Sequence, residues 1–85
     1  MKSLFLLFTL LTVLSLKAQV GVGTSTPHAS AQLEVSSTTK GYLPPRMTTV
    51  QRNAITSPAA GLTIYNTTSN AFECYNGTAW YSAVH

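Results

Sequence analysis

The sequence predicts a small, mainly β protein with one short helix (about residues 49–55) and a three-stranded antiparallel meander (about residues 61–84). Three observations predict this fold class. Strand-like runs at Leu62–Tyr65 and Phe72–Tyr75 flank a turn-rich segment. Asn76-Gly77 is the preferred pair for a two-residue hairpin turn. Residues 41–45 must be extended, because each proline there disfavours a helical conformation in the residue before it. With 85 residues, the chain has room for one domain.

Residues 1–18 are predicted to be a cleaved secretory signal peptide. Lys2 provides a positive start, Leu4–Leu16 is a largely apolar run, and small Ala18 suits the cleavage position. The alternative is an uncleaved membrane anchor, but spanning a bilayer takes about 20 apolar residues, more than this run provides. The mature chain is therefore expected to be extracytoplasmic, with no membrane span left after cleavage.

Residues 19–60 are expected to be extended, with short strands and one helix. Val20 and Val22 alternate with glycines before a turn that contains a proline, which predicts an edge strand. Leu33 and Val35 flank Glu34, the period of a half-buried strand.

The predicted helix begins at a Thr-x-x-Gln capping box, Thr48 to Gln51. Met47, Val50 and Ala54 would lie along its packed side. So short a helix is marginal by itself and needs a surface to lie on.

Residues 61–85 carry the predicted meander. If Asn76-Gly77 forms the two-residue turn, Tyr75 faces Thr78, and Glu73 faces Trp80. Because strand side chains alternate between faces, an odd number of residues in the first connection would place two sets of side chains on opposite faces. These sets are Leu62, Ile64, Phe72, Cys74 and Tyr81 on one side, and Thr63, Tyr65, Glu73, Tyr75 and Trp80 on the other. An even number of residues would place each side chain of the first strand on the opposite face. Both faces carry large apolar groups, so a second chain is the simplest cover.

The composition argues against several functional classes. Without residues 1–18 the chain keeps three cations and two glutamates, a net charge of +1, which gives no basic patch for nucleic acid. The metal-ligating side chains lie at no ligand spacing, and neither histidine has an acidic neighbour that would orient it as a catalytic base. We therefore expect no enzyme activity, metal or cofactor. Cys74 is the only cysteine, either a small buried hydrophobe or an interchain bridge.

Three aromatic residues are the candidate contact residues for a ligand or partner: Tyr65, Tyr75 and Trp80. Such rings stack on sugars or meet a protein partner. The alternative is that they pack inside the protein or against a neighbouring subunit.

Two stretches resemble segments of known surface proteins. Val20-Gly21-Val22-Gly23-Thr24-Ser25-Thr26-Pro27 with Leu33-Glu34-Val35 resembles a segment of phage tail-fibre-like and bacterial surface proteins. Residues 40–48, 61–66 and 75–80 resemble a module of secreted proteins of Gram-negative bacteria. The resemblance covers about residues 20–80. It implies an extracellular, fibre-like or adhesin-like protein that forms trimers, and it carries over no catalytic residue.

We therefore expect a secreted, non-enzymatic structural or adhesion module that associates with copies of itself or with a surface protein. One alternative is a small carbohydrate-binding domain that uses Tyr75 and Trp80. Another is a non-functional fragment of a longer surface protein, which would fold poorly.

Overall fold

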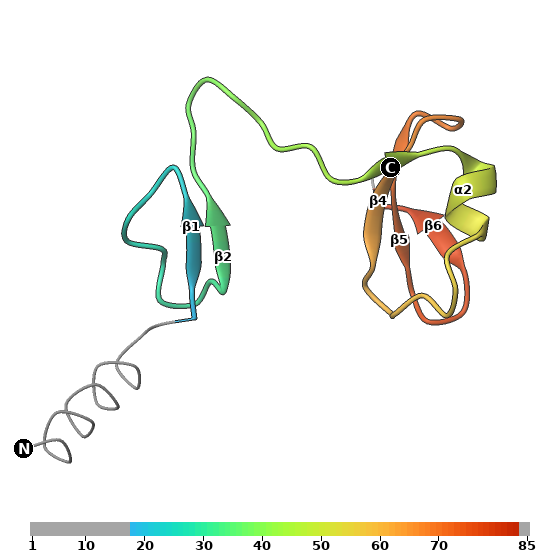
Figure 1. Ribbon diagram of the computed structural model, residues 1–85, viewed down its shortest axis with the longest axis horizontal. Helices are drawn as coiled ribbons and strands as arrows, with labels where there is room; N and C mark the ends of the chain where they lie inside the picture. Colours follow the sequence, from blue (N-terminus) through green and yellow to red (C-terminus); the bar gives the residue numbers. More distant parts are fainter. Residues whose placement is uncertain (1–17, 84–85) are drawn as a thin grey trace, which may run out of the picture. The chain divides into compact units, whose positions relative to one another are not determined.

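The computed structural model describes residues 18–83, and these residues form a mainly β structure (Figure 1). Their elements are, in order, β1 (Val20–Val22), β2 (Leu33–Val35), β3 (Arg46–Met47), α2 (Thr49–Asn53), β4 (Thr63–Asn66), β5 (Ala71–Tyr75) and β6 (Trp80–Ser82). The chain divides into an N-terminal unit that ends at Gly41 and a C-terminal unit that starts at Tyr42. The predicted fold class is confirmed. The predicted signal peptide lies outside the described residues, apart from Ala18.

The N-terminal unit is built on a parallel pair, β1 and β2, with Val20 opposite Leu33 and Val22 opposite Val35. The chain turns out of β1 at Gly23, whose φ of 80° is favourable only for glycine. A side chain at Gly23 would also collide with the carbonyl oxygen of Ser36, just beyond β2. Both predicted strands are present, but the expected burial is wrong: Leu33 and Val35 are exposed, and Glu34 between them is half-buried.

The C-terminal unit contains a four-stranded sheet in the order β3-β4-β5-β6. β4, β5 and β6 pair in sequence as antiparallel neighbours, which confirms the meander. β3 was not predicted from the sequence; it pairs in parallel with the free edge of β4. It is only two residues long and directly follows two prolines, so it carries no alternating pattern that could reveal it.

The hairpin between β5 and β6 differs from the prediction. Its loop has four residues, 76–79, and Tyr75 lies opposite Trp80 rather than Thr78. The side-chain oxygen of Asn76 accepts hydrogen bonds from the backbone N–H groups of Thr78 and Ala79, each at 2.8 Å, which favours the longer loop. The two-residue shift keeps every side chain of β6 on its predicted face, because alternation has period two.

The first connection of the meander decides which face Tyr65 occupies. Residues 67–70 connect β4 to β5, with Asn66 opposite Ala71. This connection has an even number of residues, so the assignment of β4 based on an odd one is wrong. Tyr65 lies beside Phe72, and Ile64 lies beside Glu73. Asn70, at φ 55°, closes the turn.

The helix α2 begins as predicted but packs differently. Thr48 is its N-cap, and its side chain accepts a hydrogen bond from the Gln51 N–H while the Gln51 side chain accepts one from the Thr48 N–H. The helix ends at Asn53, two residues earlier than expected. The expected packed side is wrong, since Val50 is 80 % exposed. Arg52 and Thr49 face the sheet instead, because a polar cluster there provides their hydrogen-bond partners.

Candidate association surfaces

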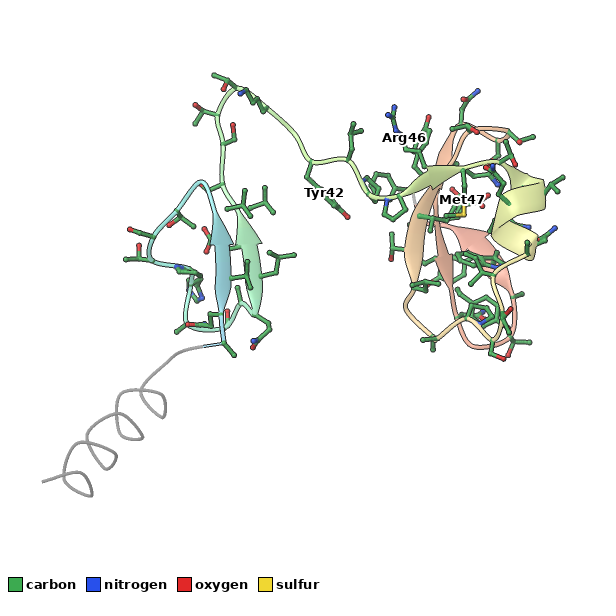
Figure 2. All side chains as sticks on the ribbon, in the orientation of Figure 1. Tyr42, Arg46 and Met47 are labelled. Carbon is green, nitrogen blue, oxygen red and sulfur yellow. The ribbon has the colours of Figure 1, made fainter. Side chains whose placement is uncertain are left out.

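One face of the C-terminal sheet is covered by α2 and centred on polar groups. Strand alternation places Ile64, Asn66 and Glu73 on this face, and all three are buried. Figure 2 shows Met47 on the side of the sheet that α2 covers, whereas Arg46 points away from it. We call the side chains of Thr49, Arg52, Asn66, Ser69 and Glu73 the polar cluster.

Asn66 is the centre of the polar cluster and has no exposed surface. Its amide nitrogen donates to the Thr49 hydroxyl and to a Glu73 carboxylate oxygen, each at 2.9 Å. Its amide oxygen accepts from the backbone N–H groups of Thr68 at 2.8 Å and Ser69 at 3.2 Å. An asparagine amide offers two donors and two acceptor sites, so this side chain is fully satisfied. Among the described residues, every buried side-chain nitrogen or oxygen has a partner.

Glu73 is held in its ionised form by the polar cluster. Burial raises the pKa of its carboxyl, but hydrogen bonds from Asn66, Arg52 and Ser69, together with the charge of Arg52, outweigh burial. The pKa of Glu73 therefore lies below its ordinary value. The Arg52 guanidinium, 2.8 Å from the carboxylate, ties α2 to the middle of the sheet.

Arg52 also determines what Trp80 can contact. Its guanidinium carbon lies 5.5 Å from the centre of the Trp80 ring, in the geometry of a cation–π contact. Tyr75 packs against Trp80 edge to face, with ring centroids 5.3 Å apart. One face of the indole is therefore taken up inside the protein, which argues against carbohydrate stacking there. A ligand role for Tyr75 and Trp80 stays a prediction.

Tyr65 does not join the other two candidate residues. It lies on the opposite face of the sheet, where its ring meets Phe72 edge to face at 6.2 Å. Cys74 and Tyr81 pair across the strands on this same face. Cys74 is half-buried, and its sulfur lies 3.3 Å from the Thr63 hydroxyl. Tyr81 is 50 % exposed, while Tyr65 and Phe72 are half-buried.

The most uniform apolar surface lies in the N-terminal unit. The parallel register places Val20 beside Leu33 and Val22 beside Val35, so all four side chains share one face. We call this set the aliphatic stripe. All four are exposed: 51 % and 52 % for the valines of β1, 59 % for Leu33 and 46 % for Val35. The sequence predicts these four residues as strand residues; their shared alternation is the signal that could also have predicted a common surface.

The opposite face of this two-stranded sheet is closed by its own connection. A side chain at Gly21 would collide with Thr24 and Pro27, so the loop lies directly against the backbone there. The Glu34 carboxylate accepts a hydrogen bond from the His28 N–H at 2.7 Å. The Gln19 side chain donates to three carbonyl oxygens of the same loop, including that of Ala31 at 2.8 Å. One face is thus covered, and the aliphatic stripe is not.

The described residues show no arrangement for metal chemistry or for a membrane span. No three of their His, Cys, Asp or Glu side chains gather as a metal site would require. Within residues 18–83, no helix has the length and apolar character that crossing a bilayer demands.

Residues 21–85 match the model of a protein family described as "Phage tail like trimerisation region". No curated protein and no solved structure matches the chain. The family match includes the whole C-terminal unit and three of the four residues of the aliphatic stripe.

Proposed function

The chain belongs to the family of phage tail-like trimerisation regions, and on this premise we propose that it is an exported structural or adhesion module that works as a homotrimer. The family is a structural one rather than an enzyme family. Membership makes the chain a tail-fibre-like module that associates with copies of itself. Trimer stoichiometry, export and adhesion are the parts that we propose.

The observation that carries the proposal is the distribution of apolar side chains. Among the described residues, the buried apolar side chains are only Ile64, at 2 % exposure, and Pro44. Large hydrophobic side chains are exposed in both units. Small modules need a further source of stability when their own core is this limited, and oligomerisation is one of the few available. A trimer would bury part of this exposed apolar surface.

The solution mass of the exported protein tests the trimer. We expect light scattering on the protein recovered from the periplasm or medium to give three times the chain mass at micromolar concentration, with no change on moderate dilution. A protein that remains a single chain over that range, with a cooperative melt, would overturn the proposal. A disordered circular dichroism spectrum would instead favour the fragment alternative.

The proposal that the chain is exported depends on residues 1–18 being a signal peptide. A charged residue introduced into the apolar run of this segment tests the proposal. Leu7→Arg should prevent translocation and leave the unprocessed chain inside the cell, because the apolar run of a signal peptide must stay uncharged. Ser3→Arg is the matched control, since it adds the same charge where a positive residue is favourable. Mass spectrometry of the exported wild type should show an N-terminus at Gln19. Efficient export of the Leu7 variant would refute the assignment.

Adhesion would be a property of the assembled module and not of a single pocket. The polar cluster uses its hydrogen-bonding groups internally, and Trp80 is engaged by Arg52. Binding of the exported protein to host or bacterial cell surfaces, compared with its dissociated form, tests this part. Binding by neither form would remove adhesion from the proposal, and equal binding by both forms would show that adhesion does not depend on assembly.

A further inference from the structure

We propose that the aliphatic stripe, formed by Val20, Val22, Leu33 and Val35, is the surface through which copies of this chain meet. Each N-terminal unit would turn the aliphatic stripe inward and its loop-covered face outward. This inference rests on the proposed self-association and adds to it the residues that form the contact.

The N-terminal unit has only one face free for such a contact. The Gly21 and Glu34 side of the sheet is occupied by the loop from Thr24 to Ala31, through backbone contact at Gly21 and the hydrogen bond from His28 to Glu34. The other side carries the four aliphatic side chains, which are 46 % to 59 % exposed. A partner that covers this sheet must therefore approach from the aliphatic stripe.

The sheet also needs such a cover. Two-stranded sheets are marginal in water unless a hydrophobic face packs against something else. The aliphatic stripe exposes on the order of a few hundred Å² of contiguous apolar surface, comparable to the largest patch on a typical monomeric protein, which is often functional. The four side chains are Val and Leu, which bury well and lose little rotamer freedom on burial.

A second copy of this chain fits the aliphatic stripe better than a charged partner does. Glu34 and Lys40 are the charged residues of the described part of the N-terminal unit, and neither belongs to the aliphatic stripe. Glu34 lies on the loop-covered face. Identical copies would therefore meet through a neutral apolar surface, without repulsion between like charges. The match to a trimerisation region, which spans Val22, Leu33 and Val35, points to copies of the same chain.

The exposed aromatic face of the C-terminal unit is the competing surface. Tyr65 and Phe72 there are already half-buried and pack on each other. Tyr81 is the exposed aromatic ring of that face, at 50 %. If this face formed the contact, substitutions in the aliphatic stripe would leave the assembly unchanged.

A paired Val→Thr substitution tests the aliphatic stripe. V22T/V35T replaces a methyl with a hydroxyl on two residues that lie opposite each other, and threonine keeps the branched shape that favours strands. Each hydroxyl buried without a partner should weaken association on the order of tenfold or more. We expect sedimentation to show dissociation at concentrations where the wild-type chain remains assembled. V50T is the matched control, because Val50 is 80 % exposed on α2, and it should assemble as the wild type does.

Unfolding of the N-terminal unit in V22T/V35T would also abolish assembly. Cross-linking of chains that carry one thiol distinguishes this cause from loss of the contact. In a C74A background, V35C places one thiol on the aliphatic stripe, and V50C places one on α2. A short bismaleimide should join V35C chains into covalent dimers on a denaturing gel at protein concentrations where V50C chains stay single.

The outcomes separate this inference from the proposed function. A wild-type trimer that V22T/V35T dissociates, together with cross-linking at V35C, supports both. A wild-type trimer that survives V22T/V35T, or one in which V35C does not cross-link, overturns the aliphatic stripe as the contact and leaves the trimer intact. A wild-type monomer overturns the proposed function itself.

Discussion

Replacing Asn66 with aspartate should unfold the C-terminal unit at neutral pH. The substitution keeps the shape of the side chain and both of its acceptor contacts to the turn. It replaces the amide nitrogen, which donates to Glu73 and Thr49 at 2.9 Å, with a second carboxylate oxygen. Asn76→Asp is the matched control. Asn76 accepts the same two turn hydrogen bonds, but it is exposed to solvent.

The magnitude follows from the contacts of the amide nitrogen. The lost hydrogen bond to the Glu73 carboxylate contributes about 1.5–3 kcal/mol, whereas the Thr49 hydroxyl can rotate and donate to the new carboxylate oxygen. Repulsion between two carboxylates about 4 Å apart adds roughly 1–4 kcal/mol, depending on the local dielectric. Protonating one carboxyl at pH 7 relieves this repulsion, and with an ordinary pKa near 3.9 it costs about 4 kcal/mol, which sets the upper limit. We therefore expect N66D to lose about 2.5–4 kcal/mol.

That loss is most of the free energy of unfolding that so small a unit is expected to have. At about 0.05–0.15 kcal/mol per residue, about 40 residues give a free energy of unfolding of roughly 2–6 kcal/mol. N66D should therefore be largely unfolded at pH 7 at the protein concentration where the wild type is folded. N76D should remain within about 0.5 kcal/mol of the wild type, because solvent accommodates its charge.

The pH dependence should have opposite signs in the two proteins. In the wild type the folded pKa of Glu73 is lowered, so its stabilisation is present above the ordinary value of 4.5 and is lost as the pH falls through the folded pKa. In N66D the two carboxyls share a proton, so their folded proton affinity is raised. Stability should then increase as the pH falls from 7 towards 4.

Urea denaturation monitored by fluorescence measures both effects. Trp80 is the only tryptophan of the chain, and it contacts Arg52 and Tyr75 within the C-terminal unit. The titrations should be made at one protein concentration from pH 7 to pH 4, for the wild type, N66D and N76D. If N66D is as stable as N76D at pH 7, or if its stability falls with pH in parallel with the wild type, the polar cluster does not hold this unit together.

Two further substitutions test the backbone geometry of each unit. Gly23→Ala should open the β1–β2 pair, since its φ of 80° and its close approach to the strand end leave no room for a methyl. Hydrogen exchange of the β2 amides should be much faster, while Gly41→Ala, with open space around it, should leave them protected. Thr48→Ala should cost about 1 kcal/mol by removing the cap that accepts the Gln51 N–H, measured as a lower urea midpoint. Thr48→Ser should restore most of it, and equal midpoints for the two variants would contradict the capping role.

The elements that short-range chemistry determines were predictable from the sequence. The capping box depends only on residues 48–51, and it is present as expected. The meander depends on two strand-like runs and their turns, and it is also present. The faces of β5 and β6 relative to each other survived an error of two residues in the turn, because the error preserved the alternation.

Features that depend on the length of a connection or on distant partners were not predictable. The face that Tyr65 occupies depends on whether four or an odd number of residues connect β4 to β5, and nothing in composition decides this. The buried side of α2 followed Arg52 and not Val50, since the partner of Arg52, Glu73, lies twenty-one residues away. The buried position of Asn66 combines the same two difficulties, because its four hydrogen bonds involve both a turn and a distant helix.

These errors change where the chain most needs another copy of itself. The sequence predicts that the meander, with large apolar groups on both faces, is the part that needs a second chain. In the structure, α2 covers one of those faces through the polar cluster, and rings on the other are already half-buried. In the described part of the N-terminal unit, from residue 18, the four aliphatic side chains share one open face, and the loop of the same unit occupies the other. A sheet of two strands gains more from burying that face than the completed meander would from burying Tyr81. Self-association is therefore a stronger requirement for residues 20–35 than for residues 61–83.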